Sequence, residues 1–238
     1  MANSYFKFKQ FTIHQERCAM KVCTDACLFG AYVAAKTTTS GHILDIGTGT
    51  GLLALMLAQN TEAHIDAIEL DAEAAGQAIE NVAASPWNDR IFVINRSIQD
   101  YYKNTERKYN LIISNPPFYE NSLKSPEEAR NTAIHADALP LSDLVDAISS
   151  LLDKSGTVAL LLPPYESSLA KVLLEAKGLY LNELVTIKDQ PQERVIREIT
   201  FYSFYNLQTV TTEITIKTSE GAYSPAFTDL LKDYYLYL

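Results

Sequence analysis

Between residues 42 and 206, short apolar segments alternate with segments of helical character, and this alternation constrains the fold more than any other feature of the chain. The apolar segments predict strands over residues 42–46, 64–70, 91–95, 109–114 and 157–162. The segments that follow them predict helices over residues 52–59, 72–84, 141–152 and 165–176. Strands that alternate with helices form a mostly parallel sheet with helices on both faces. We therefore expect a doubly wound, Rossmann-like α/β fold.

Two further β-rich segments, residues 179–188 and 194–205, flank a Gln-Pro-Gln-Glu turn and predict an antiparallel hairpin at one edge of the sheet, which would then have seven strands. Residues 1–41 precede the first strand and include an expected helix over residues 24–36. Residues 207–238 add a possible strand at 209–217 and a helix from Ser224 to Tyr235. Since no segment resembles a linker, we expect one domain over residues 1–238, with residues 42–206 as its core and the two ends as extensions.

Composition excludes several classes of protein. Three cysteines, Cys18, Cys23 and Cys27, make an odd number in a spacing that fits no common zinc site, so neither a disulfide framework nor a metal centre is expected. The apolar runs are too short to cross a bilayer and the first residues lack a secretory pattern, which favours a cytoplasmic protein. A net charge of −9 argues against binding nucleic acid by overall charge, although a local basic face remains open.

A glycine-rich run, Asp45-Ile46-Gly47-Thr48-Gly49-Thr50-Gly51, lies between the first strand and the next helix. Glycines there allow a sharp turn and a close approach of a ligand to the backbone. A dinucleotide-binding loop would place its third glycine where Leu52 stands, and no Gly-Lys-Ser/Thr follows to form a P-loop. The pattern G-x-G-x-G preceded by an aspartate is instead similar to that of methyltransferases that use S-adenosylmethionine, a cofactor without a pyrophosphate.

Glu69 ends the second strand about 20 residues after the glycines, where a carboxylate can accept hydrogen bonds from both hydroxyls of a ribose. Alone, such a residue is most simply an exposed acid at the end of a strand. The glycine run before it favours the ligand-binding interpretation. Ser97 and Ile98 follow the third strand, at the position where such enzymes hold the adenine of the cofactor.

The segment Asn115-Pro116-Pro117-Phe118 directly follows the strand expected over residues 109–114. The prolines stiffen the loop and remove backbone donors, so the Asn115 side-chain oxygen and the Pro116 carbonyl can both accept from one planar amino group while Phe118 stacks on its ring. Two acceptors favour the pyramidal geometry of an attacking nitrogen and stabilise its growing positive charge, so no strong general base is needed. The alternative is a rigid turn with a surface aromatic residue.

Together these segments resemble class I methyltransferases with the N/D-P-P-Y/F signature, which act on amino groups conjugated to a planar system. The stretch from Phe8 to Val22, followed by Thr24 and Asp25, resembles the opening of the bacterial tRNA1(Val) adenine N6-methyltransferases, and Ala129-Arg130 and Arg197-Glu198 also fit. The resemblance covers nearly the whole chain. It implies S-adenosylmethionine-dependent N6-methylation of adenine 37, next to the anticodon of tRNA1(Val), with tRNA as the partner and a monomer as the favoured state.

The resemblance and the motifs together define the expected site. Lys21, Thr24 and Asp25 would close over the methionine part of the cofactor, and residues 7–17 would face RNA. The expected catalytic residues are Asn115, Pro116, Pro117 and Phe118. The expected cofactor-binding residues are Lys21, Thr24, Asp25, Asp45, Gly47, Thr48, Gly49, Gly51, Glu69, Leu70, Ser97, Ile98 and Asn115. The expected substrate-binding residues are Lys7, Lys9, His14, Arg17, Phe118, Arg130, Arg194 and Arg197.

The sequence departs from the family pattern at two positions: Cys23 stands where glycine is commoner, and Ser97 stands where aspartate is commoner. Other functions also remain open at this stage. The same four-residue motif serves methylation of a glutamine amide in a protein, or of another RNA or DNA adenine. Against the protein substrate, the chain lacks a separate N-terminal helical domain. A module that binds RNA without catalysis is a further alternative.

Overall fold

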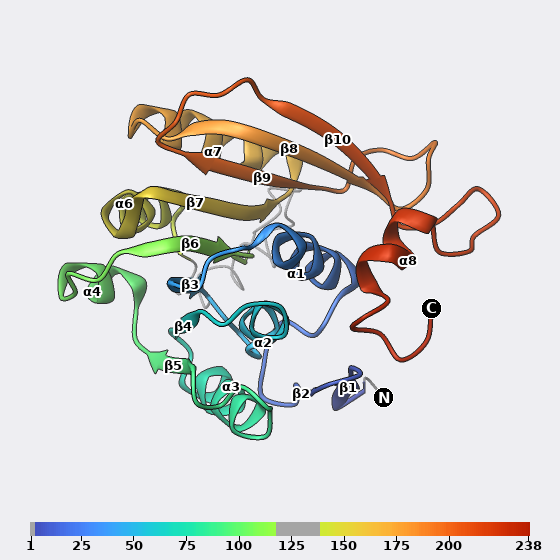
Figure 1. Cartoon of the computed structure of the whole chain (residues 1–238), viewed down its shortest axis with the longest axis horizontal. Helices are drawn as coiled ribbons and strands as arrows, with labels where there is room; N and C mark the ends of the chain where they lie inside the picture. The colour runs from blue at the N-terminus through green and yellow to red at the C-terminus, as the bar shows by residue number, and fades with distance from the viewer. Residues whose placement is uncertain (1–2, 118–138) are drawn as a thin grey trace, which may run out of the picture.

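A sheet with the strand order β10-β8-β9-β7-β6-β3-β4-β5 runs through the centre of the molecule (Figure 1). The structure is a computed structural model that describes residues 3–117 and 139–238. The strands of the sheet are β3 (His42–Ile46), β4 (His64–Glu69), β5 (Ile91–Asn95), β6 (Tyr109–Ser114), β7 (Leu152–Leu162), β8 (Tyr180–Lys188), β9 (Arg197–Ser203) and β10 (Val210–Thr215).

The expected mostly parallel sheet is confirmed. Only β9 runs against its neighbours, and it pairs antiparallel with both β7 and β8. The strand number and the edge position of the hairpin need correction, because β10 pairs in parallel with β8 beyond the hairpin and makes this an eight-stranded sheet among the described residues. Five of the six residues of β10 are β-branched, which suits a pleated strand, and they extend the sheet past the position where the sequence predicted its edge.

Helices cover both faces of the sheet. On one face lie α1 (Thr24–Lys36), α2 (Leu52–Ala58) and α3 (Ala72–Ala83), and on the other lie α4 (Ile98–Lys103), α6 (Leu141–Leu151) and α7 (Pro164–Ala176). A short helix α8 (Pro225–Leu231) packs against α1 and β10. It ends four residues before Tyr235, where the sequence had predicted its end.

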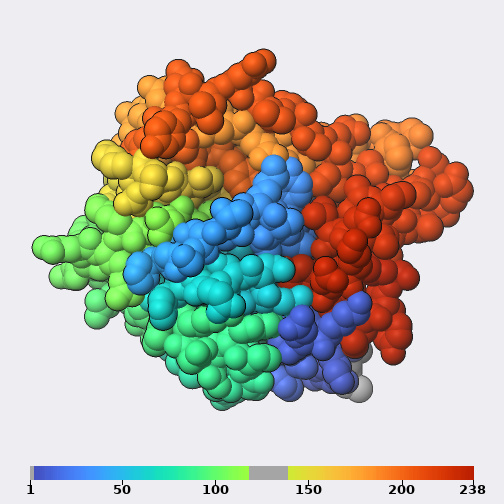
Figure 2. All heavy atoms as spheres, viewed as in Figure 1, coloured from blue at the N-terminus to red at the C-terminus, as the bar shows by residue number. Residues whose placement is uncertain are grey.

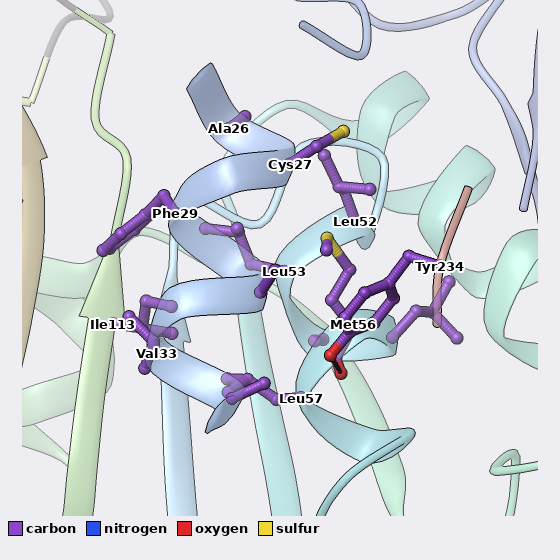
Figure 3. Packing of buried hydrophobic residues seen from close by; sticks show 14 of the residues in the cluster. Ala26, Cys27, Phe29, Val33, Leu52, Leu53, Met56, Leu57, Ile113 and Tyr234 are labelled. Atoms are coloured by element: carbon purple, nitrogen blue, oxygen red, sulfur yellow. Dashed lines mark hydrogen bonds between the residues drawn. The ribbon is translucent and has the colours of Figure 1, made fainter. Parts of the chain in front are cut away.

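A separate apolar core fills the space on each side of the sheet. Figure 3 shows the first, where Cys27 of α1 lies beside Leu52 of α2, and Leu53 and Met56 of α2 also pack against α1. The two helices approach closely because Gly30 has no side chain: a Cβ atom there would lie 2.6 Å from the Met56 sulfur. This packing fixes the helix that begins at Thr24 against the helix that follows the glycine run.

The sequence analysis missed an N-terminal hairpin of β1 (Tyr5–Lys7) and β2 (Thr12–His14). The hairpin contacts the C-terminal segment of the chain. Phe8 forms a β-bridge with Tyr235, and the Lys9 amide donates to the Tyr234 carbonyl over 2.8 Å. In Figure 2 the N-terminal segment, in dark blue, accordingly lies beside the C-terminal segment, in red. The two ends of the chain thus hold each other on the α2 side of the sheet.

Across residues 3–117 and 139–238, no helix combines the length and the apolar composition needed to cross a bilayer.

Candidate active site

The chain reverses its direction of winding at β3. It passes from β3 to β4 and β5 on one side, and then returns to β6 and β7 on the other side. Ligands of doubly wound sheets bind outside the carboxyl ends of the strands at such a switch point. Ile46 and Ser114, the last residues of β3 and β6, are register partners, and the Ser114 hydroxyl donates to the Ile46 carbonyl over 2.7 Å. The glycine loop and Asn115 therefore lie side by side. We call the loops that follow β3, β4 and β6 the carboxyl edge.

The glycine loop has a backbone that only glycine adopts readily. Gly47, Gly49 and Gly51 have φ angles of 72°, 56° and 83°, in the left-handed region. A Cβ atom on Gly51 would lie 3.6 Å from the Ala78 Cβ atom of α3, an ordinary van der Waals distance, so the backbone conformation and not the lack of space favours glycine there. A Cβ atom on Gly47 or Gly49 would meet no atom within 4 Å, so these two glycines border open space at the carboxyl edge.

Glu69 at the end of β4 is half-buried and holds the loop in place. Its Oε2 accepts a hydrogen bond from the Gly49 amide over 2.8 Å, and its Oε1 accepts one from the Asp71 amide over 3.0 Å. Each carboxylate oxygen has a second lone pair, so Glu69 can still accept from two hydroxyl groups. The position expected for a ribose acceptor is therefore also the position that fixes the glycine backbone.

Asp45 on β3 is completely buried beneath the loop. The Thr48 hydroxyl donates to its Oδ2 over 2.5 Å, whereas its Oδ1 has no hydrogen-bond partner in the described structure. Burial raises the pKa of Asp45 to about 7. Because an unpaired buried acceptor is costly, Asp45 Oδ1 is a polar atom with unused acceptor capacity directly beneath the loop.

The residues that follow β6 lie between the buried core and the surface of the protein. Ser114 and Pro116 are buried, Asn115 is half-buried and Pro117 is exposed, so the Asn115 side chain lies at the boundary. Its Nδ2 approaches the sulfur of Met20 to 3.9 Å. Two residues expected in the site, Phe118 and Arg130, lie outside the described residues.

The segment from Gln15 to Cys23 passes along the carboxyl edge. The sequence analysis did not place Cys18 or Met20 of this segment in the site. Cys18 is buried, and burial together with the charges of Glu69 and Asp71 raises its pKa to about 11, so it lies on the β4 side. Met20 contacts Asn115 on the β6 side. No periodicity in the sequence marks these two residues, because the contacts span the fold.

Asp25 and Arg197 were expected to bind the cofactor and the RNA respectively, yet the structure pairs them with each other. Arg197, the first residue of β9, lies with its Nε 3.2 Å from Asp25 Oδ2 at the start of α1. Thr24 beside them is half-buried, and Lys21 is exposed. All four residues therefore lie near the start of α1, and the pair joins α1 to β9.

Ser97 and Ile98 have structural contacts in the described fold. The Ser97 hydroxyl caps α4 by accepting from the Asp100 amide over 3.1 Å, and Ile98 is buried in the apolar core on that face. These contacts explain a serine at position 97 as a helix cap. Leu70, by contrast, directly follows Glu69 and is half-exposed, so it presents an apolar side chain at the carboxyl edge.

The basic residues expected to face RNA do not gather in one place. Arg17 pairs with Glu80 of α3, and the Lys9 ammonium donates to the Lys232 carbonyl in the C-terminal segment. The His14 backbone exchanges hydrogen bonds with Asn81 of α3, whose amide also donates to the Thr50 carbonyl of the glycine loop. Lys7 and Arg194 are exposed, on β1 and after β8.

All three cysteines are free thiols, and Cys27 is fully buried in α1. In the part of the chain that the structure describes, no group of three or more His, Cys, Asp or Glu side chains is placed to hold a metal ion. The polar groups at the carboxyl edge are thus a glycine backbone, carboxylates and one carboxamide.

Comparisons with known proteins agree with this arrangement. A family model described as "Methyltransferase small domain" matches residues 28–139. The fold is similar to that of a predicted O-methyltransferase from Agrobacterium tumefaciens, with a TM-score of 0.65 and 18% identity over 88% of this chain and 96% of that one. It is also similar to the glycopeptide N-methyltransferase MtfA, solved with S-adenosylmethionine, with a TM-score of 0.56 and 11% identity over 75% of this chain and 87% of that one. These likenesses show that the chain has the fold of class I methyltransferases.

Curated relatives narrow the assignment. Proteins from Christiangramia forsetii and Cytophaga hutchinsonii are 41% and 42% identical to this chain, each over 100% of both sequences. Both bear the name tRNA1(Val) (adenine(37)-N6)-methyltransferase. The chain belongs to this family.

Proposed function

We propose that this protein transfers a methyl group from S-adenosylmethionine to the exocyclic nitrogen of adenine 37 in tRNA1(Val). The observation that carries the proposal is the register of β3 with β6, which puts the glycine loop and Asn115 at adjacent strand ends. The full-length relatives named for this reaction support the choice of substrate. We expect the enzyme to act in the cytoplasm as a monomer.

The residues at the carboxyl edge fit this cofactor. Glu69 has acceptor capacity for ribose hydroxyls, the space beside Gly47 and Gly49 is open, and Asp45 Oδ1 is a buried acceptor without a partner in the described structure. Carboxylates suit a cationic sulfonium, and the glycine loop contains no lysine or arginine for phosphates. When bound, the cofactor supplies an electrophilic methyl carbon.

Asn115 and Pro116 would hold the attacking amine. The Asn115 side-chain oxygen and the Pro116 carbonyl accept from the two hydrogens of the adenine amino group, which is otherwise a poor nucleophile because its lone pair is delocalised into the ring. These acceptors stabilise the positive charge that grows on the nitrogen during transfer. The proton can leave afterwards, so the site needs no strong base. Phe118, next in the motif, would stack on the base.

The expected RNA affinity is modest and depends on salt. With a net charge of −9, the protein must rely on local basic groups such as the exposed Lys21 and Arg194 to meet phosphates. A base in an anticodon loop is already partly unpaired, so presenting it to the site costs little.

The direct test is methylation of a tRNA1(Val) transcript by the purified protein, followed by mass spectrometry of the nucleosides. We expect N6-methyladenosine with the normal transcript and none with a transcript that carries guanosine at position 37. Equal methylation of both transcripts would reject the assigned position. Absence of RNA methylation together with transfer to a release-factor glutamine would favour the protein substrate instead.

Replacement of Asn115 tests the chemistry of the amide clamp. Asn115→Ala removes one acceptor of the amino group, and we expect kcat to fall by about 10³-fold, as on loss of a hydrogen bond made to developing charge. Cofactor affinity, measured by calorimetry, should stay within about twofold, because the ribose and loop contacts are intact. A variant with normal kcat would refute the proposed clamp.

A further inference from the structure

Met20 is the described residue that contacts the functional end of the Asn115 side chain. The Nδ2 of Asn115 lies 3.9 Å from the Met20 sulfur, a distance at which a large thioether sulfur still accepts a weak hydrogen bond. Met20 is 48% exposed, so this contact is made at the surface of the carboxyl edge and not within the apolar core.

The orientation of the Asn115 carboxamide decides what it can do. Rotation by 180° about the bond to the carboxamide exchanges an acceptor oxygen for a donor NH2 group of nearly the same shape. Only the oxygen can accept from an amino group; the NH2 group would oppose the hydrogens of the substrate. A partner that accepts from Nδ2 favours the productive orientation, and Met20 provides such a partner.

Short contacts on both sides of Met20 fix the segment that carries it. The carboxamide of Gln15, which is buried, accepts from the Val22 amide over 2.8 Å and donates to the Asn3 carbonyl over 3.0 Å. Cys18 is buried, and Arg17 pairs with Glu80 of α3. The backbone around Met20 is therefore held at several points, which keeps the Met20 side chain beside Asn115.

We propose that Met20 is a positioning residue for methyl transfer: its sulfur accepts a hydrogen bond from Asn115 Nδ2 and keeps the Asn115 oxygen directed at the amino group of the substrate. The inference rests on the proposed function, since it assigns Met20 a role only in a reaction that Asn115 serves. The inference adds a residue outside the Asn-Pro-Pro-Phe motif, because Met20 lies 95 positions away from Asn115 in the sequence.

Two substitutions of similar size distinguish a role of the Met20 sulfur as a hydrogen-bond acceptor from a role of the side-chain volume alone. Met20→Leu keeps the apolar volume but removes the acceptor, and Met20→Gln supplies a carbonyl oxygen at a similar reach. We expect kcat to fall about 3- to 10-fold in Met20→Leu, the size of one modest hydrogen bond, and to recover in Met20→Gln. The KM for tRNA and the affinity for S-adenosylmethionine should stay unchanged in both. Met56→Leu, the same exchange in the core between α1 and α2, is the matched control and should keep the normal kcat.

The outcomes distinguish the inference from the function beneath it. A wild-type protein that does not methylate tRNA1(Val) would reject the proposed function, and with it the assigned role of Met20. Active wild-type protein with an unchanged kcat in Met20→Leu would reject the inference alone. Equal losses in Met20→Leu and Met20→Gln, or a loss expressed in KM instead of kcat, would show that Met20 acts by shape and not as an acceptor.

Discussion

Two buried aspartates on neighbouring strands have opposite surroundings. Asp66 on β4 has three donors on one oxygen: its Oδ2 accepts from the Tyr109 hydroxyl over 2.6 Å, from an Arg107 nitrogen over 2.7 Å and from the Tyr101 hydroxyl over 3.2 Å. Asp45 on β3 has the Thr48 hydroxyl on one oxygen and no described partner on the other. Asp66 faces the core beneath α4, and Asp45 lies beneath the glycine loop.

The difference separates a group that holds the fold together from a group whose hydrogen-bonding capacity the described structure leaves partly unused. A buried charge with several donors stabilises the elements that supply those donors, here α4, β6 and the loop between them. A buried acceptor left unpaired costs stability unless another molecule completes it. Burial of a carboxylate alone therefore identifies neither role, whereas the number of its donors separates the two.

The largest expected effect is the loss of stability on removal of the Asp66 carboxylate. Asp66→Ala leaves the Tyr109 and Tyr101 hydroxyls and Arg107 without their common acceptor, and we expect a loss of about 3 kcal/mol in the free energy of unfolding. Urea denaturation measures this loss, and Asp100→Ala on the exposed side of α4 is the control that should change little. The affinity for S-adenosylmethionine of the folded variant should be normal; a large change in that affinity would break the distinction between the two aspartates.

The next effect concerns the pH dependence of stability at Asp45. Its pKa in the folded protein is raised to about 7 by burial, so the protonated carboxyl stabilises the fold. That contribution is complete below about pH 4, the pKa of an unfolded aspartate, and is lost as the pH rises through about 7.

Asp45→Asn keeps the shape without the charge. At pH 8 we expect it to exceed the wild type in unfolding free energy by on the order of 2 kcal/mol. The advantage should disappear at pH 4, and denaturation series at several pH values measure it. An advantage of the same size at every pH would contradict the assigned titration.

The smallest effect sharpens the role of Glu69, which both fixes the loop and has acceptor capacity left. Glu69→Gln removes the charge and part of the acceptor capacity, and we expect S-adenosylmethionine to bind about tenfold more weakly, equivalent to about 1.4 kcal/mol. Calorimetry measures the affinity, and Glu73→Gln, an exposed residue in the first turn of α3, is the matched control. Equal effects of both substitutions would reduce the role of Glu69 to general electrostatics.

The sequence predicted the parts of the fold that local patterns specify. Every strand from β3 to β9 was expected, because each is a short apolar run beside a turn or a helix, and the glycine run marked the end of β3. The elements that escaped prediction are short or depend on distant partners. The strands β1 and β2 have three residues each and α4 has six. A strand was expected over residues 209–217, where β10 lies, but its place at the edge of the sheet depends on its pairing with β8 and was not expected.

The same limit applies to the site. Asp45, Glu69 and Asn115 were recognisable because each stands at a strand end with a recurring spacing. The contact between Met20 and Asn115, and the ion pair between Asp25 and Arg197, join segments that are far apart in sequence. No local pattern encodes such contacts, and their roles and those of the expected RNA-binding residues remain predictions.

The buried carboxamide of Gln15 has a practical consequence for handling the protein. It joins Asn3 to Val22, so the amino-terminal end of the described chain is connected by two hydrogen bonds to the segment that borders Asn115. A purification tag fused at the amino terminus would pull on that connection and disturb turnover measurements. The carboxyl terminus, where Tyr237 is 89% exposed, is the better place for a tag or a surface attachment.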